Sequence, residues 1–164
     1  MGIDFKGRVA IVTGAGGGLG RQHALALAAR GAKVVVNDLG GDVHGLGGSV
    51  SAAQAVVDEI LAAGGEAIAN GASVTDFEAV QQMVQQAMDT WGRVDILVNN
   101  AGILRDKSFA KMELADFRLV MEVHVMGAVH CTKAVWPIMQ AQNYGRVVMT
   151  TSSSGLYGLS LIHI

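Results

Sequence analysis

The chain has 164 residues, of which 51% are hydrophobic and 16% are charged, with 22 glycines and a formal net charge of -2. This composition predicts one folded domain and argues against a disordered chain. The sequence contains no basic tract and no apolar run of about 18 residues, so nucleic acids and membranes are poor candidate partners, and we expect a cytoplasmic protein.

Short β-branched segments alternate along the chain with segments of helical periodicity. In chain order, the sequence predicts a strand at 8–14, a helix at 20–31, a strand at 33–38, a helix at 51–65, a strand at 66–74, a helix at 75–92, a strand at 94–102, one or two helices within 113–141 and a strand at 145–153. The last helical stretch is expected to stop near Pro137 or Asn143. Apolar strands separated by helices predict a doubly wound parallel sheet of the Rossmann type, an α/β fold with ligands at its first crossover.

A glycine-rich segment, TGAGGGLG, runs from Thr13 to Gly20 between the first strand and the first helix. The free N–H groups and the positive dipole end of a helix N-terminus suit a pyrophosphate. We expect Gly14 to permit a sharp turn, and Gly18 and Gly20 to remove β-carbons that would block close approach. The segment, including Leu19, is therefore predicted to bind a dinucleotide, with an ordinary structural turn as the alternative.

An acidic residue, Asp38, ends the second strand 18 residues after Gly20. A carboxylate at this place can accept hydrogen bonds from the ribose hydroxyls of an adenosine. It also repels a ribose 2′-phosphate, and neither 15–17 nor 37–41 contains a Lys or Arg that would attract one. The sequence thus predicts NAD as the cofactor rather than NADP. The alternative is a solvated acid at the end of a strand.

Three motifs together resemble the short-chain dehydrogenase/reductase family: TGAGGGLG, NNAG at 99–102 and SSSGLYG at 152–158. Two longer stretches, VVVNDLGG at 34–41 and NNAGILRDKSF at 99–109, resemble the 3-hydroxyacyl-CoA dehydrogenase domains of peroxisomal multifunctional β-oxidation enzymes and their bacterial relatives. The resemblance implies an oxidoreductase that moves hydride between NAD and a secondary alcohol or ketone. It also implies a small-molecule substrate, an acyl-CoA among the candidates, a homo-oligomeric parent protein, and a peroxisomal location if that parent is a eukaryotic multifunctional enzyme.

The resemblance assigns cofactor-binding roles after the third and fourth strands. Ser73 and Val74, expected at the end of the third strand, would hold the adenine ring, although many family members have Asp in place of Ser73. Asn100, Ala101 and Gly102 would line the cofactor and hold the central sheet; a purely structural role is the alternative.

The resemblance also names candidate catalytic residues. Ser152 corresponds to the serine that hydrogen-bonds the substrate oxygen, with Ser153 as the alternative by a shift of one residue. His124 stands where many members carry an Asn that supports a proton-relay water, and it is either catalytic or a buried, hydrogen-bonded histidine. We predict no metal site, because His124 and His130 lie six residues apart and do not share a helix face.

The end of the chain carries a separate expectation. The family's catalytic tyrosine and the lysine that follows it would fall beyond the last residue, and Tyr157 lies too close to Ser152 to be that tyrosine. The final LSLIHI equals the translation of CTG-TCT-CTT-ATA-CAC-ATC, the end of a sequencing adapter. We therefore expect 1–158 to be an incomplete dinucleotide-binding domain lacking its C-terminal strands and 159–164 to be a non-native tail, with a genuine, divergent C-terminus as the alternative. The chain by itself is then expected to be a catalytically inactive fragment that binds the dinucleotide.

Two further expectations concern apolar side chains. Cys131, which is the single cysteine of the sequence, is expected to be a small buried hydrophobic residue rather than a reactive thiol. Without the helix that follows the last strand, the apolar face around Val123, Val129 and Trp136 is expected to be exposed.

Overall fold

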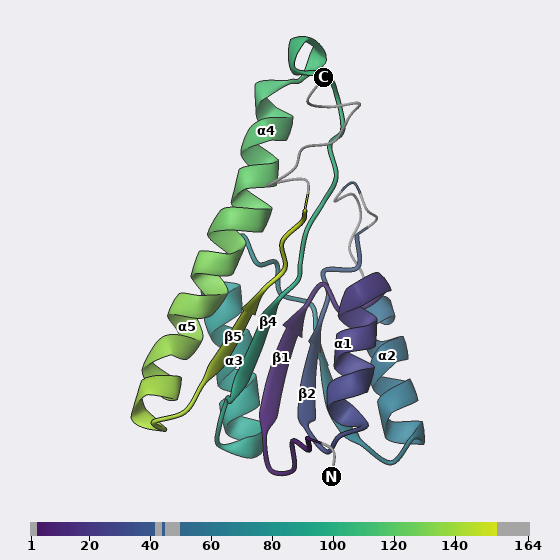
Figure 1. The fold of residues 1–164 in the computed structure, drawn as a ribbon, viewed down its shortest axis with the longest axis vertical. Coiled ribbons are helices and arrows are strands. Elements are labelled where there is room, and N and C mark those ends of the chain that lie inside the picture. The colour runs from purple at the N-terminus through teal and green to yellow at the C-terminus, as the bar shows by residue number, and fades with distance from the viewer. Residues whose placement is uncertain (1–2, 42–43, 45–49, 154–164) are drawn as a thin grey trace.

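The computed structural model describes residues 3–41, 44 and 50–153, and therefore excludes Tyr157 and the predicted non-native tail. Within these residues, five parallel strands form one sheet in the order β3-β2-β1-β4-β5 (Figure 1). The strands are β1 (Val9–Thr13), β2 (Lys33–Asn37), β3 (Glu66–Asn70), β4 (Ile96–Asn99) and β5 (Arg146–Met149). The predicted doubly wound parallel sheet is confirmed, and its strand order reverses between β1 and β4.

Helices cover both faces of this sheet. The helical elements are α1 (Gly18–Ala28), α2 (Ser51–Ala62), α3 (Phe77–Trp91), the short 3-10 turn η1 (Phe109–Lys111), α4 (Leu114–Met121), the π-helical segment η2 (Glu122–Met126) and α5 (Gly127–Ala141). The helices α1 and α2 pack on one face, and α3 and α5 pack on the other. In Figure 1, α4, η2 and α5 form one long rod that extends past the carboxyl ends of the strands.

Two apolar cores lie on the two sides of the sheet, and the strands contribute alternate residues to each. Ala10 and Val12 of β1 face the α1 and α2 core, whereas Val9 and Ile11 face the α3 and α5 core. All five residues of β1 are buried, which explains why its sequence is apolar without alternation. Cys131 is 1% exposed within the α3 and α5 core, which confirms the expectation that it is buried.

The observed strands end earlier than predicted at their carboxyl ends. The third strand ends at Asn70, rather than continuing to Val74, because the chain turns through local hydrogen bonds. The backbone N–H of Ala72 donates to Asn70 Oδ1 over 2.9 Å, and that of Thr75 donates to Ser73 Oγ over 3.3 Å. The residues beyond the strand ends therefore form loops at the edge of the sheet.

Of the two predicted helical stops, the one at Pro137 is wrong, because α5 continues through this residue to Ala141, and the one near Asn143 is confirmed. The chain leaves the helix just before Asn143, whose φ of 51° is left-handed, and Tyr144 N then donates to Met139 O over 3.1 Å. The sequence predicted either one helix or two within 113–141. The structure has two, α4 and α5, which η2 joins.

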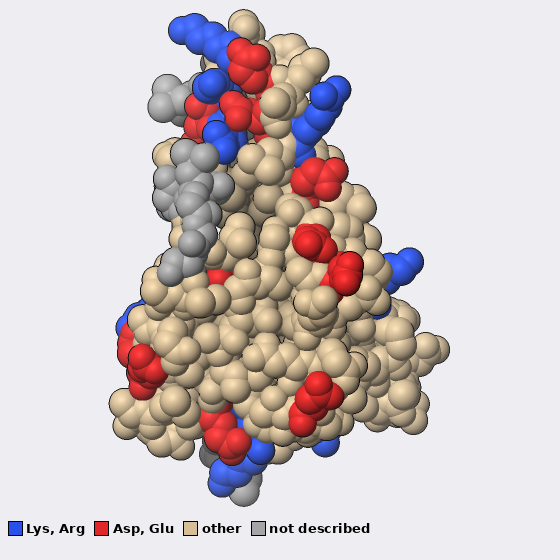
Figure 2. All heavy atoms as spheres, turned by 180° about the vertical axis from the view of Figure 1, so that it is seen from behind, with Lys and Arg blue, Asp and Glu red and all other residues tan. Residues whose placement is uncertain are grey.

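The apolar face around Val123, Val129 and Trp136 was expected to be exposed, and the structure confirms this for two of the three residues. Val129 and Trp136 are 48% and 59% exposed, whereas Val123 is half-buried against the α3 and α5 core. Within the described residues, no helix combines the length and apolar character needed to cross a bilayer. Figure 2 shows charged side chains of both signs scattered over a mostly uncharged face.

Candidate functional site

A cleft of about 540 Å³ lies at the carboxyl ends of the central strands, where the strand order reverses. Four loops line it, one after each of β1, β2, β3 and β4, and α4 and η2 add Leu119 and Val123. The lining residues are Gly14, Gly16, Gly17, Gly18, Asn37, Asp38, Leu39, Gly41, Ala52, Ala72, Ser73, Val74, Thr75, Asn100, Ala101, Gly102, Ile103, Leu119 and Val123. Ligands of doubly wound sheets bind at this kind of position.

The loop after β1 is tied to the loop after β4 through Thr13. Its Oγ1 accepts hydrogen bonds from the N–H groups of Asn100 and Ala101, both over 3.0 Å, and donates to Val98 O over 3.3 Å. In return, Asn100 Nδ2 donates to Thr13 O and Gly14 O, again over 3.0 Å each. Thr13 therefore shapes the cleft without lining it, whereas Asn100 and Ala101 both line it and hold the sheet together.

The predicted glycines have different surroundings. Gly14 has a φ of 61° and lines the cleft, as expected of the residue that permits the turn. A β-carbon on Gly20 would lie 2.1 Å from Gly14 O, so this glycine makes room for protein backbone rather than for a ligand, and it does not line the cleft. Gly18 opens α1 and lines the cleft, whereas Leu19 is 67% exposed outside the lining.

The carboxylate of Asp38 is held at the edge of the cleft by two backbone donors. Its Oδ2 accepts from Gly16 N over 2.8 Å, and its Oδ1 accepts from Gly40 N over 2.7 Å. Each carboxylate oxygen can accept a further hydrogen bond, so the half-buried group can still receive hydroxyl donors from a ligand. None of the described residues that line the cleft is Lys or Arg.

Two residues of this region were missed by the sequence reasoning. A β-carbon on Gly16 would lie 2.8 Å from the Asp38 carboxylate, so the contact between loop and acid requires glycine there. Asn37 is 1% exposed, and its Nδ2 donates to Asn70 Oδ1 and Ala72 O over 3.0 and 2.9 Å. An amide inside an otherwise apolar strand is the signal that could have identified Asn37, because a buried polar group needs partners.

The loop after β3 brings Ser73 and Val74 into the cleft lining, as the resemblance implied. Ser73 Oγ lies 2.8 Å from Thr75 Oγ1. Val74 is 8% exposed, and its carbonyl oxygen lies 2.9 Å from Nδ1 of His130 on α5. The loop is thus attached to α5 through an imidazole.

The two candidate catalytic residues are placed differently. His124, on η2, is hydrogen-bonded as expected, with Nε2 lying 3.1 Å from Ile103 N and 2.9 Å from Ile103 O, but it is exposed rather than buried. Gly102, under its ring, lines the cleft. Ser152 and Ser153 are exposed and follow β5, and neither belongs to the cleft lining.

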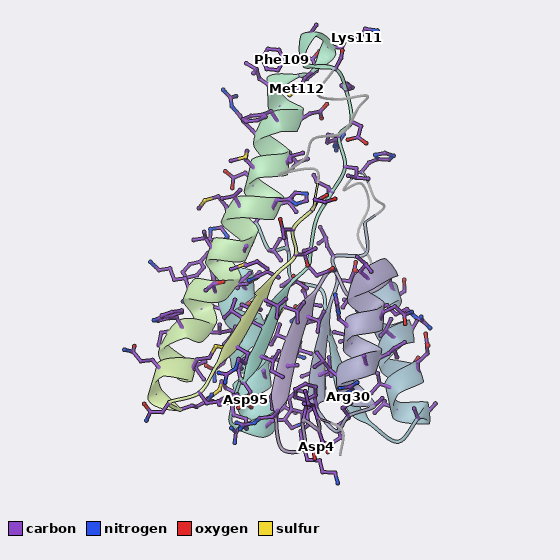
Figure 3. All side chains as sticks on the ribbon, viewed as in Figure 1. Asp4, Arg30, Asp95, Phe109, Lys111 and Met112 are labelled. Carbon is purple, nitrogen blue, oxygen red and sulfur yellow. The ribbon has the colours of Figure 1, made fainter. Side chains whose placement is uncertain are left out.

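The buried charge of the described chain lies away from the cleft. Asp95 is fully buried and accepts hydrogen bonds from Arg93, Arg8 and the N–H of Val9, over distances of 2.7 to 3.0 Å. Burial acts to raise the pKa of Asp95, but these hydrogen bonds outweigh it and lower the pKa below its usual value. Figure 3 shows Asp95 at the amino ends of the strands, far from the tip of the rod at Phe109.

Metal binding has no support in the described part of the chain, where no three His, Cys, Asp or Glu side chains are grouped to hold an ion. The site is therefore a cleft made of backbone amides, small side chains and one carboxylate.

Comparisons with known proteins agree with this geometry. Residues 8–163 match the family model for short chain dehydrogenase. The peroxisomal multifunctional enzyme type 2 of Mus musculus is 55% identical over 156 residues, which are 95% of this chain and 21% of the mouse protein. A 3-oxoacyl-acyl-carrier-protein reductase of Synechocystis is 46% identical over 151 residues, 92% of this chain and 58% of that enzyme.

A solved structure is similar in both fold and sequence. The complex of a 7α-hydroxysteroid dehydrogenase with NADH and 7-oxo glycochenodeoxycholic acid is 37% identical, with a TM-score of 0.84, covering 93% of this chain and 56% of that one. The chain thus spans only part of the length of these relatives. The family match over nearly all of its residues, together with the cleft at the β1–β4 crossover, shows that the chain belongs to the short chain dehydrogenase family.

Proposed function

We propose that this cleft binds NAD, and that the chain forms the dinucleotide-binding part of an enzyme that transfers hydride between NAD and a secondary alcohol or ketone. One observation carries the proposal: the glycine loop and Asp38 line the same cleft at the β1–β4 crossover. The two are in contact through Gly16 N and Asp38 Oδ2, although these residues are 22 positions apart in the sequence. The related 7α-hydroxysteroid dehydrogenase was solved with NADH, which supports the same class of cofactor here.

The N-terminus of α1 suits the diphosphate of such a cofactor. Its N-cap, Gly17, makes no side-chain capping hydrogen bond, and no acidic residue lies in the first turn. The first N–H groups of the helix therefore remain available to an anion, and the helix dipole favours negative charge there. Because Gly16, Gly17 and Gly18 carry no side chains, these amides can be approached closely from the cleft.

The remaining walls suit the rest of a dinucleotide. Asp38 would accept hydrogen bonds from the adenosine ribose, and Ser73 and Val74 would contact the adenine ring. Asn100, Ala101 and Gly102 would then lie along the nicotinamide half, whose ring supplies the site of hydride transfer when bound. The carboxylate charge, with no cation in the described lining to offset it, favours NAD over NADP.

The proposed substrate is a 3-hydroxyacyl or 3-oxoacyl thioester. The name of the Synechocystis relative, a 3-oxoacyl-acyl-carrier-protein reductase, supports this substrate class. Ser152 would donate a hydrogen bond to the substrate oxygen and polarise a carbonyl as hydride arrives. The whole protein would be a homo-oligomer, located in the cytoplasm or, if it is a eukaryotic multifunctional enzyme, in the peroxisome.

Calorimetry with NAD and NADP, followed by an assay of NADH formation from a 3-hydroxyacyl-CoA, tests these statements in order. We expect the chain to bind NAD more tightly than NADP, and Asp38→Ala to reduce that preference. Asp58→Ala, which removes an exposed carboxylate of α2, is the matched control and should leave binding unchanged. Failure to bind either dinucleotide would overturn the proposal, while binding without turnover would favour the inactive dinucleotide-binding fragment.

A further inference from the structure

Two histidines attach η2 and α5 to two loops that line the cleft. His124 contacts the backbone of Ile103, and His130 contacts the carbonyl oxygen of Val74. Both Ile103 and Val74 belong to the cleft lining. Two imidazole rings therefore connect these loops to the rod.

The ring of His124 lies directly against the backbone of the loop after β4. A β-carbon on Gly102 would be only 2.6 Å from Cε1 of the ring and 3.2 Å from Nε2. The adjacent Nε2 lies 3.1 Å from Ile103 N and 2.9 Å from Ile103 O, so the same nitrogen reaches both a donor and an acceptor. The π-helical segment η2, which is an uncommon helical geometry, carries the histidine to this place.

A single ring nitrogen cannot satisfy both groups at once. Without a proton, Nε2 is an acceptor and pairs with the N–H of Ile103; with a proton, it is a donor and pairs with the carbonyl oxygen of Ile103. An imidazolium carries protons on both nitrogens, so protonation removes the first hydrogen bond and leaves only the second. An asparagine amide, which has an acceptor and a donor on separate atoms, would not face this choice.

The second histidine behaves differently. Nδ1 of His130 lies 2.9 Å from a carbonyl oxygen, which can only accept, so this nitrogen carries a hydrogen in the neutral ring. Protonation of His130 adds a hydrogen to the other nitrogen and leaves the bond to Val74 in place. His130, also in contact with the ring of Phe77, is therefore a natural control for His124.

Charged groups near His124 belong to its own segment and to the elements packed on it. By position in the chain, the charged residues of these elements are Glu122 on η2, Asp116 and Arg118 on α4, Lys133 on α5, and Arg105, Asp106 and Lys107 on the loop after β4, and His44 contacts that loop at Leu104 O. Arg105 and Lys107 are both paired with Asp116. None of the ion pairs among the described residues involves His124.

We propose that His124 is a pH-sensitive positioning residue of the cleft. In the switch, the neutral ring carries its hydrogen on Nδ1, so Nε2 accepts the hydrogen bond of Ile103 N–H and holds the loop from Gly102 to Ile103 in one arrangement. Its protonated ring exchanges this bond for the carbonyl oxygen and lets the peptide group rotate, which changes the floor of the cleft. The switch rests on the geometry of His124 alone, and its effect on cofactor affinity rests in addition on the proposed function.

Nuclear magnetic resonance of the labelled full chain tests the switch without any ligand. Between about pH 5 and 8, the range in which histidines change charge, the amide resonance of Ile103 should move with the same midpoint as the ring protons of His124. In His124→Asn the Ile103 amide should no longer titrate with pH, whereas in His130→Asn it should titrate as in the wild type. An Ile103 amide that does not follow the His124 ring in the wild type would overturn the proposal, and this outcome needs no variant to fold.

The affinity for NAD, measured by calorimetry across the same pH range, tests the consequence for binding. We expect a several-fold loss of affinity on acidification in the wild type and in His130→Asn, and an affinity nearly independent of pH in His124→Asn. An identical pH dependence in His124→Asn would refute the coupling. If NAD did not bind at any pH, the proposed function would be wrong. The pH dependence of the Ile103 amide resonance would still test the switch by itself, because that experiment needs no ligand.

Discussion

Replacing Gly20 by alanine should destabilise the protein, although a helical glycine normally gains stability from this change. The β-carbon would lie 2.1 Å from Gly14 O and 2.5 Å from Asn100 Nδ2, whereas real β-carbons keep at least 3.0 Å from such atoms. The helix or the loop must therefore move by about 1 Å, since the carbonyl oxygen belongs to the backbone and has no other rotamer.

The expected magnitude follows from three opposing contributions to the free energy of unfolding. Better helix propensity would add about 1 kcal/mol of stability. Overpacking against backbone costs about 3 kcal/mol, at the upper end for such insertions. Weakening the hydrogen bond from Asn100 to Gly14 O costs about 1 kcal/mol more. The sum is a loss of about 3 kcal/mol.

Urea unfolding followed by circular dichroism measures this change, with Gly17→Ala as the matched control. A β-carbon on Gly17 would meet no atom within 4 Å, so this variant loses only the preference of an N-cap for glycine over alanine, about 1 kcal/mol or less, clearly below the loss expected for Gly20→Ala. A Gly20→Ala protein as stable as the wild type would refute the packing argument. It would return Gly20 to the role predicted from the sequence, which is to make room for a ligand.

Three further predictions follow from the structure. Asp38→Ala combined with Leu39→Arg should shift the preference of the complete enzyme from NAD towards NADP, and an unchanged ratio of the two kcat/KM values would remove Asp38 from its assigned role. Asp95→Asn should lower the free energy of unfolding by about 2 to 3 kcal/mol at neutral pH. Folding lowers the pKa of Asp95, so its contribution to the free energy of unfolding is complete above the ordinary carboxyl pKa and disappears as the pH falls through the pKa of the folded state. The loss of stability caused by Asp95→Asn should therefore become smaller in acid. A difference in stability that does not change with pH would contradict this. Burial raises the pKa of Cys131 to about 12, so a thiol reagent at neutral pH should modify it only in denaturant, and rapid labelling of the native protein would contradict its placement in the core.

The order of elements and the parallel sheet could be predicted because they depend on local apolar patterns. The run VVVN in β2, for example, is buried on both faces, and its shortness and β-branched residues indicate a strand. Strand ends could not be placed in the same way. Ala72 and Ser73 are compatible with a strand by their residue types, and the hydrogen bonds that turn the chain there depend on Asn37 and Asn70.

Long-range contacts limited the prediction of the site. Gly20 is part of the expected glycine pattern, but its reason for being glycine is an oxygen of Gly14 on the facing loop. A buried, hydrogen-bonded histidine was one of the two alternatives for His124; the residue is hydrogen-bonded to Ile103 but exposed, in a π-helical segment that the sequence did not indicate. Asp38 lies directly after β2 and lines the cleft, and this position could be predicted because it follows from chain order; its contact with a cofactor remains a prediction.

The hydroxyl of Thr13 has a thermodynamic consequence for any molecule that enters the cleft. It joins three backbone groups of the strand and loop beside it, so contacts within the protein hold the two loops that flank the crossover. These loops then lose little conformational entropy when a ligand binds, so little of the binding free energy is needed to order them. In Thr13→Val, which has a methyl group in place of the hydroxyl, ligand binding would have to order these loops, and the affinity would be lower.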